Sequence, residues 1–295
     1  MSVLVASIGF GLISTSILAI AAVGFTLQFG VTNVFNLAYG SVMTGAAYAA
    51  YVANQFGVDI WVSMVLGGLF GAALSLLINR GLYTPFARHG LGLAGIIQVT
   101  LALGLILENG LQAIFGPSYH SYQMSQGPSF HFGSMVFTAV QVGIMGIALA
   151  SMIGVHALLA HTKLGKAMRA TAADAPLARS CGIRTEFVTD IAWLLSGLLC
   201  GIAGVILVMD LQSFTSTTGS NFLVPVLAAA VLGGIGQPYG AMLGALIIGM
   251  VSEVAAAVTL PQYKEVIAFV ILLVVLLFRP RGILAEVASL KEVVA

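Results

Sequence analysis

The sequence predicts an all-α integral membrane protein, a polytopic helical bundle of about eight or nine transmembrane segments with broken helices. Hydrophobic residues make up 59% of the 295 positions and charged residues only 7%, against about 25% in soluble domains. Asp59 is the first charged residue, so residues 1–58 hold more apolar length than one span of about 20 residues can use. Glycine pairs four residues apart, such as Gly67/Gly71 and Gly197/Gly201, allow close helix contact in lipid.

Apolar runs separated by polar residues define the elements in order. The N-terminal stretch lacks the positive charge that precedes the core of a signal peptide, so we expect the first helix to remain. Residues 211–252 carry no charge and are expected to cross twice, turning at 233–240, GGIGQPYG. The expected helices are 8–29, 36–53, 61–79, 93–115, 136–159, 187–208, 223–235, 240–258 and 263–278, or one span fewer if one is re-entrant. No soluble segment is visible, so residues 1–295 are expected to form a single transmembrane domain.

The basic residues predict the orientation of the chain. They lie at Arg80 and Arg88, within 163–184, and at Arg279, Arg281 and Lys291, with Lys264 standing apart. The positive-inside rule places the three basic segments, and with them the C-terminus, in the cytoplasm. In a bacterial inner membrane, the loops near 54–60, 116–134 and 209–222 would then face the periplasm.

Several functions are disfavoured by the sequence. The nearest approach to a nucleotide-binding P-loop, at Lys163 to Ala167, lacks the upstream glycine and the final hydroxyl. No Cys, His, Asp and Glu cluster has metal-ligand spacing, and no acid, base and nucleophile share one depth in the spans. The net charge of +1 comes without a basic patch for nucleic acid. We expect no enzymatic activity, metal or cofactor in this chain, and two unpaired cysteines.

Two acidic residues lie within expected spans. Glu108 and Glu253 each stand several residues inside the outer end of a helix. Carboxylates in a bilayer are costly and often functional. Near an interface, however, either can be satisfied structurally, for Glu253 by a partner such as Lys264. Neither resembles a proton relay at the midplane, which argues against an ion-coupled transporter.

A polar interruption near the beginning is the first candidate site. The segment 30–48, GVTNVFNLAYGSVMTGAAY, contains side chains and a glycine that weaken a helix. Irregular backbone at membrane depth is tolerated where it lines a cavity. Tyr39-Gly40-Ser41 recurs weakly as Tyr239-Gly240-Ala241, and paired interruptions indicate a translocation site. The alternative is a plain loop between the first two helices. The candidates for the substrate path are Asn33, Asn36, Tyr39, Gly40, Ser41, Thr44 and Glu108.

The second candidate site is the stretch 161–187, HTKLGKAMRATAADAPLARSCGIRTEF, which holds five of the eleven basic residues. The pattern between Gly165 and Gly182 predicts one compact amphipathic helix of about 15 residues, interrupted by Pro176, with Asp174 near its middle. The alternative is a solvated loop that fixes topology or binds anionic membrane lipids. That alternative does not explain the alanine-rich helical face.

Five segments together resemble the permease subunits of ABC importers for branched-chain amino acids. They are NLAYGSVMTGAAY (36–48), LGKAMRATAADAPLARSCGI (164–183), AAAVLGGIGQPYGAMLGALIIG (228–249), EVAAAVTLPQYKEVIAF (253–269) and LLFRPRGIL (276–284). No segment is diagnostic alone, but their order and spacing are specific. The resemblance runs from about residue 10 to residue 284. One departure is that many members of the family carry His and Glu where this chain has Tyr39 and Ser41.

The resemblance implies a set of partners and a role for the second site. Two related permeases pair, two cytoplasmic ABC ATPase subunits use ATP to drive them, and a periplasmic solute-binding protein delivers the substrate. The loop at about 160–186 resembles the element that docks on the ATPase. The residues implied in coupling are Gly165, Lys166, Arg169, Ala170, Ala173, Asp174, Leu177 and Gly182.

The sequence therefore predicts the permease subunit of an ATP-driven importer for branched-chain or other small amino acids. One rival is an autonomous channel or facilitator for a small neutral solute such as urea or an amide, which predicts flux through this chain alone. A weaker rival is a scaffold that recruits cytoplasmic partners through the basic stretch. The substrate, and the identity of the second permease as a copy or a relative, stay open.

Overall fold

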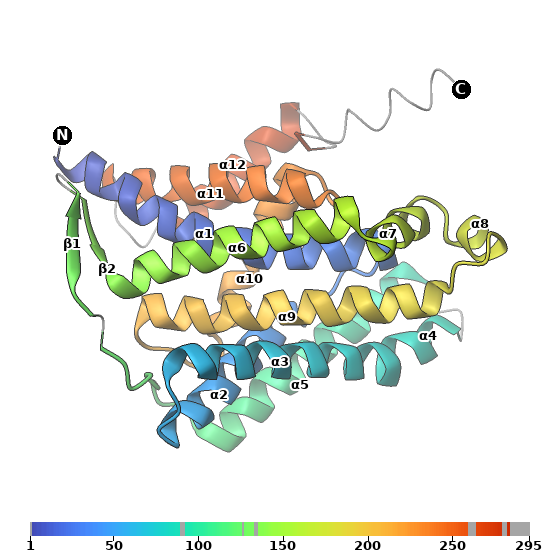
Figure 1. Cartoon of the computed structure of the whole chain (residues 1–295), viewed down its shortest axis with the longest axis horizontal. Coiled ribbons are helices and arrows are strands. Elements are labelled where there is room, and N and C mark those ends of the chain that lie inside the picture. Colours follow the sequence, from blue (N-terminus) through green and yellow to red (C-terminus); the bar gives the residue numbers. More distant parts are fainter. Residues whose placement is uncertain are drawn as a thin grey trace. The chain divides into compact units, whose positions relative to one another are not determined.

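The computed structural model describes residues 2–88, 92–125, 127–132, 135–258, 264–278 and 282–283. These residues are almost entirely helical (Figure 1). The helices are α1 (Ser2–Thr32), α2 (Tyr39–Gln55), α3 (Ile60–Ile78), the π-helix η1 (Asn79–Tyr83), α4 (Thr84–Arg88), α5 (Leu93–Phe115), α6 (Ala139–His161), α7 (Lys163–Ala173), α8 (Ala175–Ser180), α9 (Thr185–Leu211), α10 (Thr218–Gly233), α11 (Pro238–Val258) and α12 (Lys264–Phe278). A short hairpin, β1 (Ser129–Phe132) and β2 (Met135–Thr138), precedes α6.

The all-α membrane fold is confirmed. Each expected apolar helix corresponds to a helix of the structure, and the expected turn at 233–240 lies at 234–237, between α10 and α11. Within the described ranges, six helices are long and apolar enough to cross a membrane. Helices α10 and α12 contribute shorter apolar segments. The helix expected from residue 136 begins at Ala139 instead, because Met135–Thr138 pairs with Ser129–Phe132 as an antiparallel strand.

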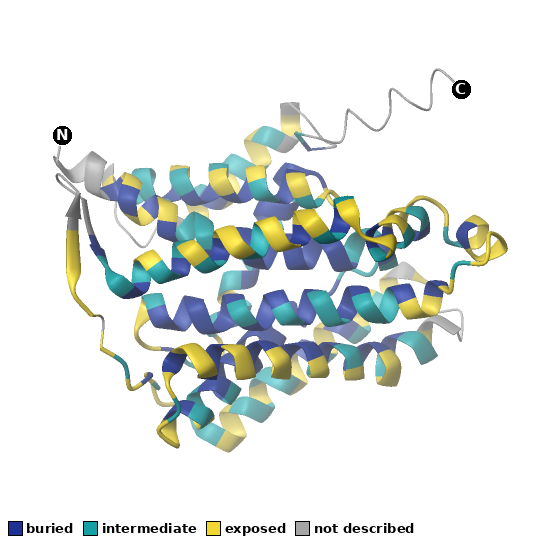
Figure 2. Ribbon diagram, viewed as in Figure 1, coloured by how far each residue is buried: buried dark blue, intermediate teal, exposed yellow. Residues whose placement is uncertain are grey.

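The chain divides into two compact units, each built from separated stretches of sequence. The larger unit contains residues 27–124 and 150–223, and α3 and α9 run side by side within it (Figure 1). Their contact depends on glycine, because a Cβ on Gly71 would lie 2.6 Å from the carbonyl oxygen of Gly197. Most of α9 is buried, whereas α3 exposes residues along one side (Figure 2). The predicted glycine contacts thus form the centre of this unit.

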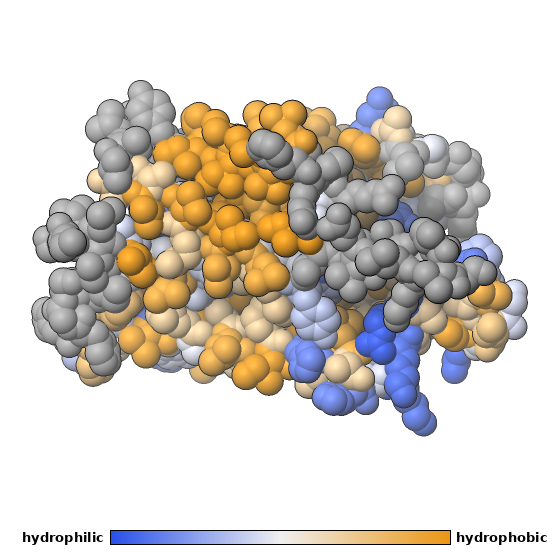
Figure 3. Space-filling view, turned by 90° about the horizontal axis from the view of Figure 1, so that it is seen from above, coloured by the Kyte–Doolittle hydropathy of each residue, from blue (hydrophilic) through white to orange (hydrophobic). Residues whose placement is uncertain are grey.

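The other unit contains residues 1–26, 125–149 and 224–295. Its turn between α10 and α11 is tight, since a Cβ on Gly240 would lie 2.1 Å from the carbonyl oxygen of Gly233. Ser14 donates a hydrogen bond to Glu253, so this carboxylate has a structural partner on α1. The side chain of Lys264, the partner considered from the sequence, lies outside the described side chains. Helices α11 and α12 expose large apolar residues, and hydrophobic side chains cover much of the described surface in Figure 3.

Candidate functional site

The predicted interruption lies between two helices, not within one. Helix α1 ends at Thr32 and α2 begins at Tyr39. Asn33 is exposed and has a left-handed backbone (φ 53°), and its N–H bonds the carbonyl of Phe29 at 2.7 Å. Asn tolerates this conformation, so Asn33 is explained as the residue that ends α1. The alternative of a loop between the first two helices therefore describes the backbone correctly.

Asn36, in contrast, is buried and forms part of a network of polar side chains. Its Oδ1 accepts hydrogen bonds from the Tyr83 hydroxyl at 3.2 Å and from the N–H of Ala38 at 3.1 Å. Its Nδ2 lies 3.5 Å from Oε1 of Gln28, which also accepts from the Ser196 hydroxyl at 3.1 Å. We call Gln28, Asn36, Tyr83 and Ser196 the amide network. It connects the segment 33–38 to α1, η1 and α9.

A second polar group lies where the first turns of α2 and α10 meet. The Ser41 hydroxyl donates to the carbonyl of Gly104 at 3.0 Å and lies 3.4 Å from the Ser220 hydroxyl. Ser220 in turn donates to Oε2 of Glu108 at 2.6 Å. Thr44 Oγ1 accepts a hydrogen bond from the N–H of Gly219 at 2.9 Å. We call Ser41, Thr44, Glu108 and Ser220 the hydroxyl cluster.

Glycine makes this contact possible. A Cβ on Gly40 would lie 2.5 Å from the carbonyl oxygen of Gly219, and a Cβ on Gly219 would lie 2.2 Å from that of Gly40. The neighbouring cavity beside Thr44 and Phe214 measures only about 10 Å³, which is about the room needed for one water molecule. This cavity, on the Thr44 side of the hydroxyl cluster, is therefore too small for an amino acid.

Aromatic rings cover the end of α2 that follows the hydroxyl cluster. His120 and Phe214, from two loops, exchange backbone hydrogen bonds of 2.9 Å. Both rings lie against Tyr48, whose buried hydroxyl has no hydrogen-bond partner among the residues that the structure describes. The Tyr122 hydroxyl donates to the carbonyl of Ala47 at 3.0 Å, and burial raises the pKa of this phenol. The two loops thus close this end of the unit.

The structure brings together only part of the predicted substrate path. Gly40, Ser41, Thr44 and Glu108 meet at the hydroxyl cluster, and Tyr39 is buried one residue away, with its carbonyl accepting from the Cys200 thiol at 3.3 Å. Asn36 belongs to the amide network, and Asn33 belongs to neither group. Sequence reasoning missed Ser220, Gly219, Gln28, Tyr83 and Ser196. Gln28 could have been found, because an amide side chain within an expected span is unusual. The others gave no signal in the sequence, because their residue types are common in such helices.

The predicted single helix between Gly165 and Gly182 is wrong. The chain forms α7 and α8, separated at Asp174, which has extended backbone and accepts the N–H of Leu177 at 2.9 Å as the N-cap of α8. Pro176 lies in the first turn of α8, where a missing N–H costs nothing. Gly182 ends α8 with φ 85°, as expected, and its N–H bonds the carbonyl of Arg179.

Helices α7 and α8, which we call the coupling helices after the role predicted for them from the sequence, contact the ends of α6 and α9. Thr162 caps α7 by accepting the N–H of Gly165 at 2.9 Å, and a Cβ on Gly165 would lie 2.3 Å from the carbonyl oxygen of Leu158. The Arg169 guanidinium donates to the carbonyl of Leu159. Among the other predicted coupling residues, Ala170 is half-buried. The solvent-exposed ones are Lys166, Ala173, Asp174, Leu177 and Gly182. The exposed surface of the coupling helices thus includes an apolar side chain, Leu177, which is 60% exposed.

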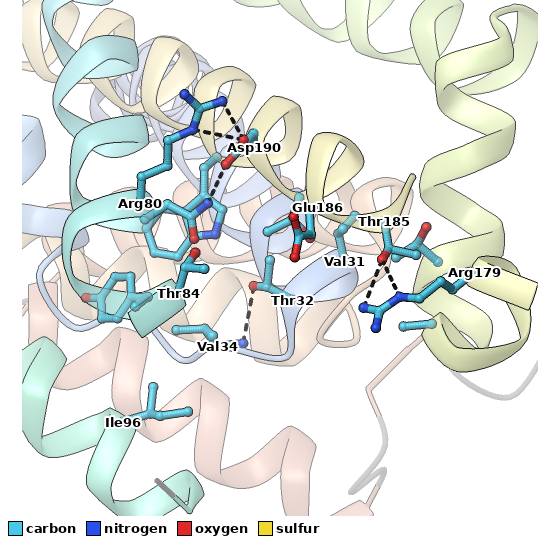
Figure 4. A pocket seen from close by; sticks show the side chains of 16 residues that line it. Val31, Thr32, Val34, Arg80, Thr84, Ile96, Arg179, Thr185, Glu186 and Asp190 are labelled. Atoms are coloured by element: carbon cyan, nitrogen blue, oxygen red, sulfur yellow. Dashed lines mark hydrogen bonds and ion pairs between the residues drawn. The ribbon is translucent and has the colours of Figure 1, made fainter. Parts of the chain in front are cut away.

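A cavity of about 700 Å³ lies beside the coupling helices (Figure 4). Its walls come from the end of α1 and the segment after it, from η1 and α4, from α5, and from the first turns of α9. We call it the junction cavity, and it is lined by Val31, Thr32, Val34, Asn79, Arg80, Tyr83, Thr84, Ile96, Thr171, Ala175, Arg179, Thr185, Glu186, Thr189, Asp190 and Trp193. It joins the coupling helices to the interruption after α1.

Two arginines border this cavity in different ways. Arg80 donates from Nε and Nη2 to Oδ2 of Asp190, at 3.0 and 2.7 Å, while Asn79 donates to Oδ1 at 2.9 Å. Arg179 donates from Nε and Nη2 to the neutral Thr185 hydroxyl, at 3.3 and 3.1 Å (Figure 4). Asp190 was overlooked in the sequence, although a carboxylate inside an expected span was itself a signal. Arg80 presents its side chain through η1, and such π-helical turns are frequent at functional sites.

The fold and these sites define the chain as a polytopic helical membrane protein of the permease class. Residues 7–276 match the family described as the branched-chain amino acid transport system permease component. The chain belongs to this family. The high-affinity branched-chain amino acid transport system permease protein BraD of Pseudomonas aeruginosa is 31% identical over 292 residues, covering 94% of both chains. LivH of Escherichia coli, a permease protein of the same description, is 29% identical over 283 residues, covering 91% of both chains.

Two further likenesses extend the comparison. The ribose import permease protein RbsC of Escherichia coli is 30% identical over 277 residues, covering 89% of this chain and 82% of RbsC. Among solved structures, a chain of PsaBC from Streptococcus pneumoniae in complex with Fab superposes with a TM-score of 0.51 at 16% identity. That match covers 95% of this chain and 94% of the PsaBC chain, and it shows a shared fold.

Proposed function

We propose that this chain is the transmembrane permease subunit of an ATP-driven ABC importer for branched-chain or other small amino acids. The observation that carries the proposal is the family match over residues 7–276, together with the 31% identity to BraD over nearly all of both chains. Because the likeness covers 94% of both chains, nearly all of the BraD sequence has a counterpart in this chain. The likeness to RbsC, named for ribose import, means that the fold serves more than one class of solute.

The proposed assembly contains a second, homologous permease, two cytoplasmic ABC ATPases and a periplasmic solute-binding protein. ATP is bound and hydrolysed by the ATPases, and this chain carries no enzymatic activity or cofactor of its own. It spans a bacterial inner membrane several times, with the coupling helices and the C-terminus in the cytoplasm. The C-terminal basic residues Arg279, Arg281 and Lys291 lie outside the described residues, so the orientation rests on the segments around Arg80 and 163–184.

The contacts in the larger unit support a route for coupling. The coupling helices pack against α9 and line the junction cavity, whose opposite walls include the segment after α1. The amide network joins that segment to α9, and a few residues further along α2 stands the hydroxyl cluster. In the proposed cycle, movement of the coupling helices reaches the hydroxyl cluster through α9 and the start of α2. Closing of the ATPases on ATP supplies the differential binding energy that shifts the conformer population.

Reconstitution into proteoliposomes tests the proposal. The chain is purified together with the proposed partner permease and ATPases, and uptake of radiolabelled L-leucine is measured with ATP and the solute-binding protein. We expect uptake that requires all components. Liposomes containing this chain alone are the matched control, because an autonomous channel would pass solute there without ATP. Uptake by this chain alone, or no co-purification with an ATPase, would overturn the proposal.

A further inference from the structure

The two loops that close the end of α2 are joined by one pair of residues. His120 lies between α5 and β1, and Phe214 lies between α9 and α10. Each donates its N–H to the carbonyl of the other at 2.9 Å, as an isolated antiparallel bridge. We call this pair the loop bridge. Because two hydrogen bonds form its backbone connection, a rearrangement of the two loops is enough to break it.

The ring of Phe214 fills the space between the loop bridge and the hydroxyl cluster. Its neighbours along the chain, Ser213 and Thr215, are exposed and half-buried, whereas Phe214 is 1% exposed. The ring lies 4.7 Å from that of Tyr48, measured between centroids. It also lines the small cavity that reaches Thr44 of the hydroxyl cluster. Phe214 therefore separates the hydroxyl cluster from the surface of these loops.

The two ends of α2 differ in the space beside them. The junction cavity, which reaches the segment before α2, measures about 700 Å³, within the range of about 300–1,000 Å³ that is usual for small-molecule sites. The cavity beneath Phe214 measures about 10 Å³. The larger unit thus has room for a solute at the start of α2 and is closed at its end. A protein that passes a solute between two sides must populate a second conformer in which the closed end opens.

Closure leaves Tyr48 with an unpaired hydroxyl. The side chain is 1% exposed, and its oxygen has no hydrogen-bond partner among the described residues. Its ring lies against those of Phe115, His120 and Phe214, with centroids 4.3, 5.6 and 4.7 Å away. A hydroxyl buried without a hydrogen bond costs free energy, and water would remove that cost if the loops parted. The closed arrangement therefore contains a contribution that favours opening.

We propose that the loop bridge is a releasable gate at the outer end of the larger unit, and that the Tyr48 hydroxyl sets how readily this gate opens. The inference rests on the proposed function for the outer position of the loops and for the passage of a solute. When the two backbone bonds break, Phe214 leaves with its loop. Water then reaches Tyr48, and the way from the outer side to the hydroxyl cluster is open.

A reversible cross-link tests the gate. Ser121 and Ser213 are exposed and stand opposite each other beside the loop bridge. The Cα atoms of such an antiparallel pair lie about 4.5 Å apart, within the range of about 4.4–6.8 Å for a disulfide. Ser121→Cys and Ser213→Cys are combined with Cys181→Ser in the complete assembly in proteoliposomes. We expect oxidation to lower ATP-dependent uptake of L-leucine at least tenfold, and dithiothreitol to restore it.

The two single-cysteine variants, treated with the same oxidant, are the matched controls. They are expected to take up L-leucine like the unmodified assembly, because neither joins the two loops. Thiol labelling measures how much disulfide has formed. Full uptake by the cross-linked variant would show that the bridge need not open. Failure of the two cysteines to cross-link would contradict the pairing of the loops, and the gate with it.

Tyr48→Phe tests the role of the hydroxyl without relying on transport. Hydrogen exchange is measured by mass spectrometry in peptides that contain His120 and Phe214. We expect exchange at least fivefold slower than in the unmodified assembly, because the variant removes a hydroxyl that is unpaired only while the gate is closed. Tyr51→Phe is the matched control. The Tyr51 ring lies 5.1 Å from that of His120, but the residue is half-buried and its hydroxyl is not buried without a partner. Unchanged or faster exchange in Tyr48→Phe would remove the role assigned to this hydroxyl.

The outcomes separate the gate from the proposed function. Uptake that persists after cross-linking removes the gate and leaves the importer intact. Absence of uptake from the unmodified assembly removes the proposed function, whereas the cross-link yield and the hydrogen exchange still decide whether the loop bridge forms and how readily it opens.

Discussion

At the scale of single residues, the larger unit depends on positions where a side chain would be too large. Gly40 and Gly219 bring α2 and α10 so close that Thr44 reaches the N–H of Gly219. Helices in lipid gain stability mainly from packing and from hydrogen bonds between them, so this contact contributes both. The hydroxyl cluster exists only because both positions lack a Cβ.

Replacing Gly40 by alanine tests this contact. The added Cβ would lie 2.5 Å from the carbonyl oxygen of Gly219. This oxygen belongs to the backbone, so it cannot easily move away. We expect a destabilisation of about 1–3 kcal/mol, seen as a lower melting temperature of the purified permease. Gly110→Ala is the control, because a Cβ on Gly110 meets no atom within 4 Å and alanine favours a helix. Equal stability of the two variants would contradict the assigned role of Gly40.

Glu108 allows its charge to be separated from its hydrogen bond. In the unmodified protein, the Ser220 hydroxyl donates to Oε2 of Glu108 at 2.6 Å. In Glu108→Gln the amide oxygen can still accept this hydrogen bond, so the melting temperature is expected to stay close to that of the unmodified protein. If the carboxylate attracts the ammonium group of the substrate, uptake of L-leucine falls at least tenfold in reconstituted vesicles. Unchanged uptake would assign Glu108 a purely structural role.

At the scale of elements, the coupling helices show that a short break can be specified by one capping residue. Helix α8 has only six residues and is separated from α7 by the single residue Asp174. Such a short helix is marginal by itself. The N-cap at Asp174 and the glycine at 182 define its two ends, and its contacts with α9 hold it in place.

Asp174→Ala removes the acceptor for the N–H of Leu177. Loss of an N-cap costs about 0.5–2 kcal/mol, which is large for a helix of this length. We expect faster hydrogen exchange at residues 177–180 and weaker stimulation of the partner ATPase. Asp174→Asn caps nearly as well without the charge, and so should restore the exchange protection. If Asp174→Asn behaves like the alanine variant in both measurements, the charge and not the cap is important.

The sequence predicted the helices well because the apolar runs are long and their ends are marked by polar residues. It failed at 163–182 because Asp174 was taken as a helical residue, although Asp followed by Ala-Pro is also a helix start. It grouped Asn36 and Ser41 in one candidate path, whereas these residues, close in sequence, bond different helices. Ser220 could not be predicted from the sequence, because only the close approach of α2 and α10 brings its hydroxyl to Glu108.

At the scale of the whole molecule, the two cysteines provide a test of orientation and coupling together. Cys181 is exposed at the end of α8, and Cys200 is buried in α9. A membrane-impermeant maleimide should therefore label Cys181 alone, and only in inside-out vesicles if the coupling helices are cytoplasmic. Bound ATPase should slow this labelling by covering α8. Cys181→Ser, expected to abolish labelling, is the control for Cys200, and Tyr119→Cys, at a position 79% exposed, reports the opposite side. Labelling of Cys181 from outside intact cells would reverse the proposed orientation and separate α7 and α8 from the ATPases.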